Sequence, residues 1–225
     1  MLEVKAISKM YSVNKGVKDI TFSIDSGEAV ALIGPNGSGK TTLLNIIAGV
    51  LKADGGIVCL DGLMNDKIEV RKNIGFLPDS IIINPKTRVA DLLNIISNYK
   101  YKGDYKEEID KELDAYRISD YKNARFGDLS LGTQKKVGLI IAFMGTPSLI
   151  ILDEPTNGID TNGIIRLKDN IREAKEKGSS VVISSHILDF VNTVADRSLF
   201  LKNTQLDTIV TGNENLESVY KKLYL

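Results

Sequence analysis

A glycine-rich segment between an apolar run and a helical pattern constrains this chain more than any other feature of its sequence. Residues 34–41 read Gly-Pro-Asn-Gly-Ser-Gly-Lys-Thr and fit the pattern G-x-x-x-x-G-K-[ST]. The apolar run Ala29–Ile33 before this segment predicts a buried strand, and apolar residues recur at helical spacing over Leu43–Ile47 after it. A strand, a glycine-rich turn and a helix in this order surround an anion of phosphate size with backbone N–H groups.

The side chains of this segment indicate a nucleotide together with a metal ion. Lys40 can reach the β- and γ-phosphates of ATP, and Thr41 can place its hydroxyl on Mg²⁺. A tight turn without a ligand is the alternative, but the flanking strand and helix favour binding. We therefore predict ATP and Mg²⁺ as ligands, and the candidate binding residues are Asn36, Gly37, Ser38, Gly39, Lys40, Thr41 and Thr42.

Two adjacent carboxylates follow the apolar strand predicted at Leu149–Leu152. Carboxylates at the end of a buried strand are costly unless they serve a ligand, and ligands of parallel sheets bind at the carboxyl ends of strands. We expect Asp153 to hold Mg²⁺, usually through water, and Glu154 to orient or deprotonate the attacking water. The alternative, a pair of carboxylates that caps the next turn, is weak beside a phosphate-binding segment.

His186 is the one histidine of the sequence and follows the apolar strand predicted at Ser180–Ser184. A lone histidine is more often a structural residue than a catalytic one. This one, however, follows another strand end of the same predicted sheet, where a contact to the γ-phosphate is needed. We therefore predict a catalytic role for His186 alongside Glu154.

The remaining sequence predicts an α/β fold. Alternating apolar residues over Leu2–Ala6 and Ile20–Ile24 predict half-buried antiparallel strands near the N-terminus. In the second half, helical patterns alternate with fully apolar strands, which is typical of a mostly parallel sheet covered on both faces. Helical spacing over Val89–Tyr116 interrupts this alternation. We expect a single domain over residues 1–225, with the core and an antiparallel β lobe at about 1–86 and 137–225 and an inserted α-helical subdomain at about 87–136.

Charge and composition bear on the partners and the location of the chain. The 29 Lys and Arg residues balance 29 Asp and Glu residues, so the basic excess typical of nucleic-acid binding is missing and we expect no nucleic acid partner. Cys59, the single cysteine, cannot form an internal disulfide, and we expect it to be a small buried residue in a reducing compartment. No secretory signal is visible, and no apolar run reaches the ~20 residues of a spanning helix. We expect a cytoplasmic protein that does not cross a membrane.

An ordered set of motifs resembles the nucleotide-binding subunits of ATP-binding cassette (ABC) transporters. Leu129–Gln134 is similar to the family signature LSGGQ and lies upstream of Leu149–Glu154 at the family spacing, and Pro155–Asp160 resembles the loop that follows. His186 then matches the switch histidine, and Tyr11 matches the aromatic residue that stacks on adenine, unless it is only a partly exposed tyrosine at a strand end. The resemblance spans the chain and implies a P-loop NTPase core.

The resemblance also implies partners. In the family, two cassettes sandwich two ATP molecules, so Ser130 and Gly132 would cap the γ-phosphate bound by the other subunit. The chain would then need a second copy or a close homologue, and a multi-spanning membrane permease at whose inner face it lies peripherally. Its separate-chain form and the segment Leu216–Tyr220 resemble ATPases that serve drug, antibiotic or peptide export. Import instead of export, and a heterodimer instead of a homodimer, stay open.

Three positions depart from the family pattern. Leu131 and Thr133 make the signature bulkier at the start of its helix. Asp79 follows the predicted strand Ile74–Leu77 where the family most often has glutamine, and we expect this shorter acid to bind Mg²⁺ or water with less reach. The hairpin residues Lys202–Thr204 lack a glycine that is often seen there. The first two departures can slow turnover, but neither removes a required charge.

Two other functions compete with the transporter ATPase. A soluble mechanochemical ABC protein that acts on ribosomes or DNA usually carries two cassettes or long coiled coils, and this sequence has neither. A regulator that binds ATP without turnover is disfavoured because Glu154 and His186 are both present. We therefore predict an ATPase that drives membrane transport, with export as the favoured direction.

Overall fold

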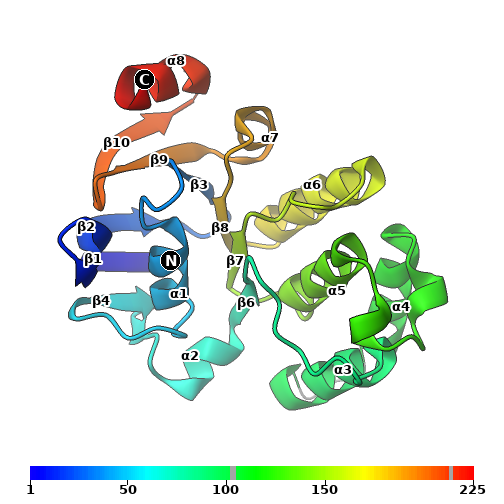
Figure 1. Cartoon of the computed structure of the whole chain (residues 1–225). Coiled ribbons are helices and arrows are strands. Elements are labelled where there is room, and N and C mark those ends of the chain that lie inside the picture. The colour runs from blue at the N-terminus through cyan, green and yellow to red at the C-terminus, as the bar shows by residue number, and fades with distance from the viewer. Residues whose placement is uncertain (102–104, 213–214) are drawn as a thin grey trace.

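Two β-sheets organise the chain in the computed structural model, which describes residues 1–101, 105–212 and 215–225 (Figure 1). The antiparallel sheet has the spatial order β2 (Lys15–Ile24), β1 (Leu2–Ser12), β4 (Gly55–Leu60) and β5 (Leu63–Met64). The larger sheet has the order β10 (Gln205–Thr211), β9 (Arg197–Lys202), β3 (Ala29–Ile33), β8 (Ser180–Ser184), β7 (Leu149–Asp153) and β6 (Ile74–Leu77). Its strands are parallel except β10, which pairs antiparallel with β9. The predicted α/β architecture is confirmed.

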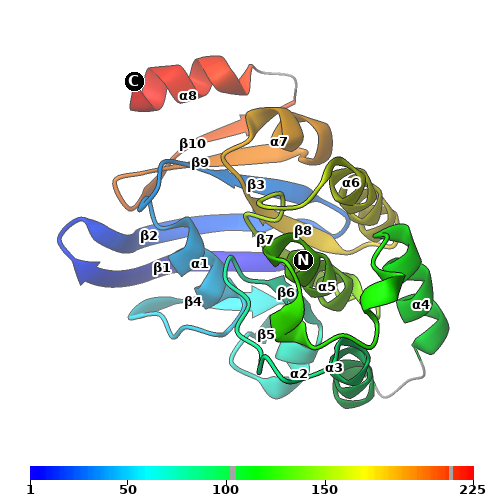
Figure 2. The same cartoon turned by 45° about the vertical axis from the view of Figure 1, so that its right-hand side comes forward.

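Helices cover both faces of the larger sheet. The helical elements in chain order are α1 (Lys40–Ile47), α2 (Ile68–Lys72), α3 (Val89–Ile96), a π-helix (Ser97–Tyr101), α4 (Lys106–Ala115), two 3₁₀ turns (Ser119–Tyr121 and Phe126–Asp128), α5 (Leu131–Phe143), α6 (Thr161–Glu176), α7 (Leu188–Val194) and α8 (Leu216–Tyr224). Helix α1 lies between the two sheets, and α5 and α6 cover the opposite face (Figure 2).

The core explains why the central strands read as continuous apolar runs. All five residues of β3 are fully buried. Val30 and Leu32 pack with Leu43 and Leu44 of α1 in the core between the sheets, whereas Ile33 packs in the cluster under α7 and α8. A strand covered on both faces has no solvent side, so alternation disappears from its sequence.

The first strand departs from the alternation expected over Leu2–Ala6. Leu2 and Val4 are buried as expected, but Ala6 is exposed and Ile7 is buried instead. The register between β1 and β2 shifts between Val4 and Ile7, and Ala6 has a φ of +52°. A β-bulge at this point adds one residue and turns the following side chains to the other face. The expectation that Ala6 faces the core is therefore wrong.

The helices expected over Val89–Tyr116 are present as α3, the π-helix and α4 (Figure 1). Helix α5 crosses the boundary expected at residues 136–137, so the helical subdomain as a separate unit stays a prediction. Cys59 is half-buried rather than buried. No helix of the described residues is long and apolar enough to cross a membrane.

Candidate functional site

An open cleft of about 830 Å³ lies at the carboxyl ends of β3, β7 and β8. Its volume falls within the roughly 300–1,000 Å³ that is usual for small-molecule sites. The cleft is lined by Tyr11, Lys15, Gly16, Gly34, Pro35, Asn36, Gly37, Gly39, Lys40, Thr41, Thr42, Asp79, Asp153, Glu154, Asn157, His186 and Tyr220. Most of the residues that the sequence singles out therefore meet here, although they come from distant parts of the chain.

The glycine-rich loop wraps the start of α1 at the floor of this cleft. Gly37 and Gly39 have φ values of +83° and +108°, which side chains rarely adopt. A Cβ at Gly39 would lie 2.4 Å from the carbonyl oxygen of Gly16, so the loop also needs glycine for its close approach to β2. The backbone N–H groups at the start of α1 are thus free of side-chain cover and suited to phosphate.

Lys40 holds its ammonium group at this loop. Its Nζ donates hydrogen bonds to the carbonyl oxygens of Gly34 at 2.8 Å and Pro35 at 3.3 Å, and the residue is buried. Burial lowers the pKa of Lys40, and the nearby carboxylates of Glu154 and Asp153 oppose that shift. A buried ammonium with carboxylates on one side and the loop on the other is placed to bind phosphate oxygens.

Asp153 ends β7 and is almost completely buried, with 1% of its surface exposed. Its Oδ1 accepts a hydrogen bond from Ser184 Oγ at 2.5 Å, whereas its Oδ2 is buried without a partner. An unpartnered buried carboxylate oxygen is costly, so a cation or a water molecule fits here.

The donor set around Asp153 suits Mg²⁺ bound together with a nucleotide. Among the described residues no group of three or more His, Cys, Asp or Glu side chains is arranged to hold a metal ion alone. Mg²⁺ usually binds one or two carboxylates and completes its shell with phosphate oxygens and water. Thr41 and Asp79, the other two residues predicted to hold the metal, also line the cleft.

Glu154 and His186 form a direct pair. The distance between His186 Nδ1 and Glu154 Oε2 is 2.9 Å, and one of the two atoms carries the shared proton. The Glu154 side chain is largely buried and that of His186 is largely exposed toward the cleft. Glu154 has a φ of +47°, a conformation that is uncommon for residues other than glycine and that concentrates at functional sites.

Asp79 meets a buried lysine from α5. Lys135 Nζ donates to the backbone carbonyl of Asp79 at 3.2 Å and lies 3.8 Å from its Oδ1. Burial lowers the pKa of Lys135, and the charges of Asp79, Asp153 and Glu154 oppose this shift. Lys135 therefore joins the helix of the signature to the carboxylates of the cleft.

The signature residues lie apart from this cleft. Ser130 caps α5, with its Oγ accepting a hydrogen bond from the Thr133 N–H at 3.2 Å. A Cβ at Gly132 would lie 2.2 Å from the carbonyl oxygen of Gly158, and Leu131 points into solvent with 81% exposed. Neither Ser130 nor Gly132 is among the described residues that line the cleft.

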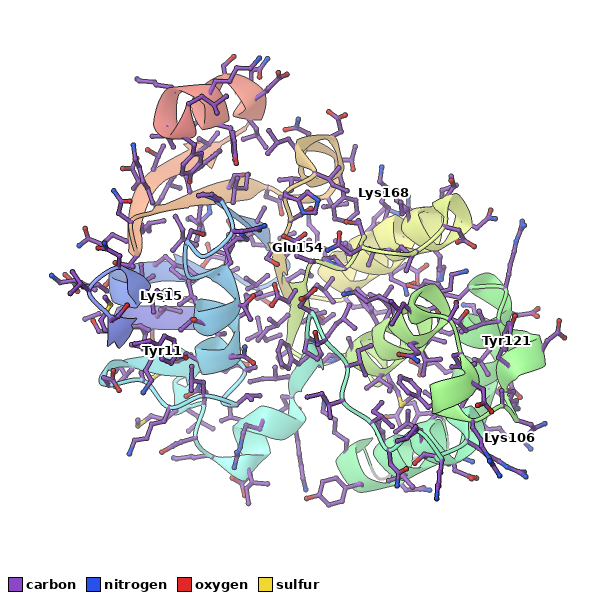
Figure 3. The ribbon with its side chains drawn as sticks, in the orientation of Figure 1. Tyr11, Lys15, Lys106, Tyr121, Glu154 and Lys168 are labelled. Atoms are coloured by element: carbon purple, nitrogen blue, oxygen red, sulfur yellow. The ribbon has the colours of Figure 1, made fainter. Side chains whose placement is uncertain are left out.

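Tyr11 and Lys15 lie at the β1–β2 side of the cleft, and Glu154 lies at the end of the larger sheet (Figure 3). Tyr11 is 59% exposed, so its ring has room for a stacking ligand. The sequence analysis missed Lys15 and Gly16 at the start of β2 and Tyr220 in α8. No motif marks these three positions, because only the tertiary fold brings them to the cleft.

Comparison with known proteins identifies the family. The family model described as ABC transporter matches residues 17–157, which is well over half of the chain. The chain belongs to the ABC transporter family.

Relatives and solved structures agree with this assignment. The SkfA peptide export ATP-binding protein SkfE of Bacillus subtilis is 33% identical over 208 residues, which cover 92% of this chain and 87% of that protein. A structure titled as the ATP-binding subunit of an ABC transporter superposes with a TM-score of 0.93 at 27% identity and covers all of both chains. A dimeric cassette in a post-hydrolysis state, bound to ADP and Pi, has a TM-score of 0.83 at 25% identity, covering 96% of this chain and 100% of that one.

The cassette is thus an ATP-binding subunit that powers membrane transport. The alternative of a soluble mechanochemical protein that acts on ribosomes or DNA has no support in these comparisons.

Proposed function

We propose that this cassette hydrolyses Mg-ATP, with Glu154 as the residue that orients the attacking water. The 2.9 Å contact between His186 Nδ1 and Glu154 Oε2 carries this proposal, because it pairs a carboxyl group with an imidazole in the cleft that also holds Lys40 and Asp153. Mg²⁺, held by Asp153, Thr41 and Asp79, would neutralise charge on the phosphates. His186 would contact the γ-phosphate, and Tyr11 would stack on the adenine.

The loop supplies the phosphate site. Lys40 would release the carbonyl oxygens of Gly34 and Pro35 and bind the β- and γ-phosphates. The backbone of residues 36–42 would surround the β-phosphate, and Ser38, whose buried Oγ lacks a partner, would gain one from the ligand.

The cassette would act as a pair. Ser130 and Gly132 lie at the start of α5 and are not among the described residues that line the cleft of their own chain. A helix N-terminus favours anions, so these residues would bind the γ-phosphate held by a second cassette. The dimeric cassette with ADP and Pi supports this arrangement. The second cassette would be a copy of this chain or a close homologue.

Export of a peptide or small toxic compound through a separate membrane permease is the transport that we favour. The resemblance to SkfE, named for export of the SkfA peptide, supports this direction. The cassette would then work on the cytoplasmic face of the membrane, without a nucleic acid partner.

The test is to purify a tagged Glu154→Gln variant from detergent-solubilised native cells in Mg-ATP and to identify the bound proteins by mass spectrometry. We expect a stoichiometric multi-spanning membrane protein and a second cassette. A Lys40→Ala variant, which would bind ATP poorly, serves as the control and should lose the second cassette. Ribosomal or DNA-associated proteins without any membrane protein would contradict the transporter assignment.

A further inference from the structure

Ser184 touches both carboxylate residues of β7 with one hydroxyl. It is the last residue of β8, is completely buried and pairs with Asp153 across the parallel ladder. Its Oγ donates to Asp153 Oδ1 at 2.5 Å and accepts from the Glu154 N–H at 2.9 Å. A hydroxyl can donate one hydrogen bond and accept two. Because the Glu154 N–H can only donate, the Ser184 hydroxyl accepts from it and has its own proton free to donate to the Asp153 carboxylate.

The two hydrogen bonds of Ser184 affect the backbone conformation of Glu154 and the free oxygen of Asp153, neither of which is needed for packing of the core. Glu154 has a φ of +47°, and its N–H is held twice by Ser184, by the Oγ and by the backbone carbonyl at 3.2 Å. Such a backbone persists only where its surroundings over-determine it. On the other side of the hydroxyl, the bond to Oδ1 leaves Oδ2 of Asp153 buried and unpartnered.

We propose that Ser184 is a positioning residue for the ATPase site. Its O–H bond fixes the Asp153 carboxylate so that Oδ2 is the oxygen offered to the divalent cation. Its acceptor role holds the backbone of Glu154 in the left-handed conformation that brings the carboxylate to His186. This inference rests on the proposed ATPase function, and groups that orient a metal ligand typically change metal affinity or activity about 10–100-fold when removed.

A matched control lies at the other end of the same strand. Ser180 begins β8, is 1% exposed, and its Oγ donates to the Asp25 carbonyl at 2.8 Å. Ser180→Ala and Ser184→Ala therefore both remove a buried hydroxyl and its donated hydrogen bond, but only Ser184 contacts Asp153 and Glu154. A purely structural role predicts similar effects for the two variants.

The experiment measures Mn²⁺ affinity by electron paramagnetic resonance in the presence of ADP, and steady-state ATP turnover, for both variants. We expect Ser184→Ala to weaken Mn²⁺ binding and lower kcat by about 10-fold or more, with KM for ATP within about threefold. Ser180→Ala should keep both within about twofold. Equal Mn²⁺ affinities for Ser184→Ala and Ser180→Ala would overturn the inference.

A second variant, Ser184→Cys, and the Mn²⁺ measurement separate failure of this inference from misfolding of the alanine variant and from failure of the proposed ATPase function. Ser184→Cys fills the site with a weaker donor, so we expect an intermediate Mn²⁺ affinity if the alanine variant does not fold. Wild-type Mn²⁺ affinity in Ser184→Cys would count against the inference. If the wild-type chain binds Mn²⁺ with ADP but does not turn over ATP, the proposed hydrolysis fails, while the Mn²⁺ comparison still decides the role of Ser184.

Discussion

At the scale of single residues, the site concentrates groups that are unfavourable for folding alone. Glu154 has a left-handed backbone, Asp153 has a buried oxygen without a partner, and Lys40 is a buried cation whose ammonium donates to two carbonyl oxygens of the loop. Strained backbones of this kind cost of order 1–3 kcal/mol each. A ligand that carries phosphate and a divalent cation would satisfy Lys40 and Asp153 together, and the strained Glu154 lines the same cleft, which is why we interpret the three residues as one site.

Gly132 provides a prediction at this scale. Gly→Ala within a helix normally stabilises a protein by about 1 kcal/mol, but here the added Cβ would lie 2.2 Å from the Gly158 carbonyl. We expect Gly132→Ala to lower the free energy of unfolding by about 1–3 kcal/mol, as overpacking does, in urea denaturation. The closest matched control is Gly163→Ala near the start of α6, whose Cβ would lie 3.1 Å from Lys136 Cε and 3.2 Å from Asp160 Oδ1, a tight contact with side chains and not an overlap with backbone.

The two glycines should therefore behave differently. Gly163→Ala should change the free energy of unfolding by less than about 1 kcal/mol. If Gly132→Ala is as stable as the wild type, the close approach of the signature to the loop around Gly158 is not as tight as the structure has it.

Sequence reasoning reached only some residues of the site. Asp153, Glu154 and His186 stand out because charged or imidazole side chains follow apolar strands. Ser184 and Lys135 do not, since a serine in a strand or a lysine in a helix is ordinary. Their roles depend on which strand or loop is the spatial neighbour, and this is decided by the β7–β8 register and by the packing of α5 on β6.

At the scale of elements, α5 links two parts of the proposed mechanism. Ser130 caps its N-terminus, Gly132 lies in its first turn, and Lys135 in its second turn donates to the Asp79 carbonyl after β6. The helix lies so close to this strand that a Cβ at Gly75 would be 1.8 Å from the Ala142 carbonyl. A shift of α5 therefore has to move the loop that contains Asp79.

Lys135→Met tests this link. The variant keeps an apolar stem but loses the ammonium that holds Asp79, so we expect kcat for ATP to fall by about 10-fold. Stability should change little, because methionine keeps the buried apolar stem and the half-exposed Asp79 carboxylate stays solvated when the lysine is lost. Steady-state phosphate release and urea denaturation measure the two effects.

Lys100→Met is the matched control for that variant. Lys100 is half-buried, and its Nζ donates to the Ile74 carbonyl at 2.5 Å, at the opposite end of β6 from Asp79. We expect this variant to keep wild-type kcat. Equal loss of turnover in both variants would show that Lys135 acts through general stability and not through Asp79.

The regular elements were easier to predict than their irregularities. Strands Ala29–Ile33 and Ser180–Ser184 have the predicted limits because apolar runs define them. The bulge at Ala6 was missed, because the sequence alternates up to Ala6 and the register shift that follows is decided by pairing with β2. The short β5 and α2 lie in a stretch without a clear apolar period.

At the scale of the whole molecule, the arrangement of the two sheets explains why the site is open. The antiparallel sheet brings Tyr11 and Lys15 to one side of the cleft, and the larger sheet brings Glu154 to the other (Figure 3). Asp153 at the end of β7 and His186 after β8 line the same cleft. Ser130 and Gly132, at the start of α5, are not among the described residues that line this cleft. We infer that a second cassette completes the site.

The fold of the whole molecule could be predicted from the sequence because the motifs of the family follow one another along the chain in a fixed order.

The measurement that tests the central claim most directly is steady-state phosphate release from Mg-ATP by the wild type and by Glu154→Gln. We expect Mg²⁺-dependent turnover by the wild type that stops when the metal is removed with a chelator. Loss of a positioned base typically lowers the reaction rate by about 10²–10⁴-fold. The Glu154→Gln variant should therefore have a kcat lower by about 100-fold or more and should still bind ATP. Turnover by Glu154→Gln within a few-fold of the wild type would contradict the assignment of Glu154 and the mechanism built on it.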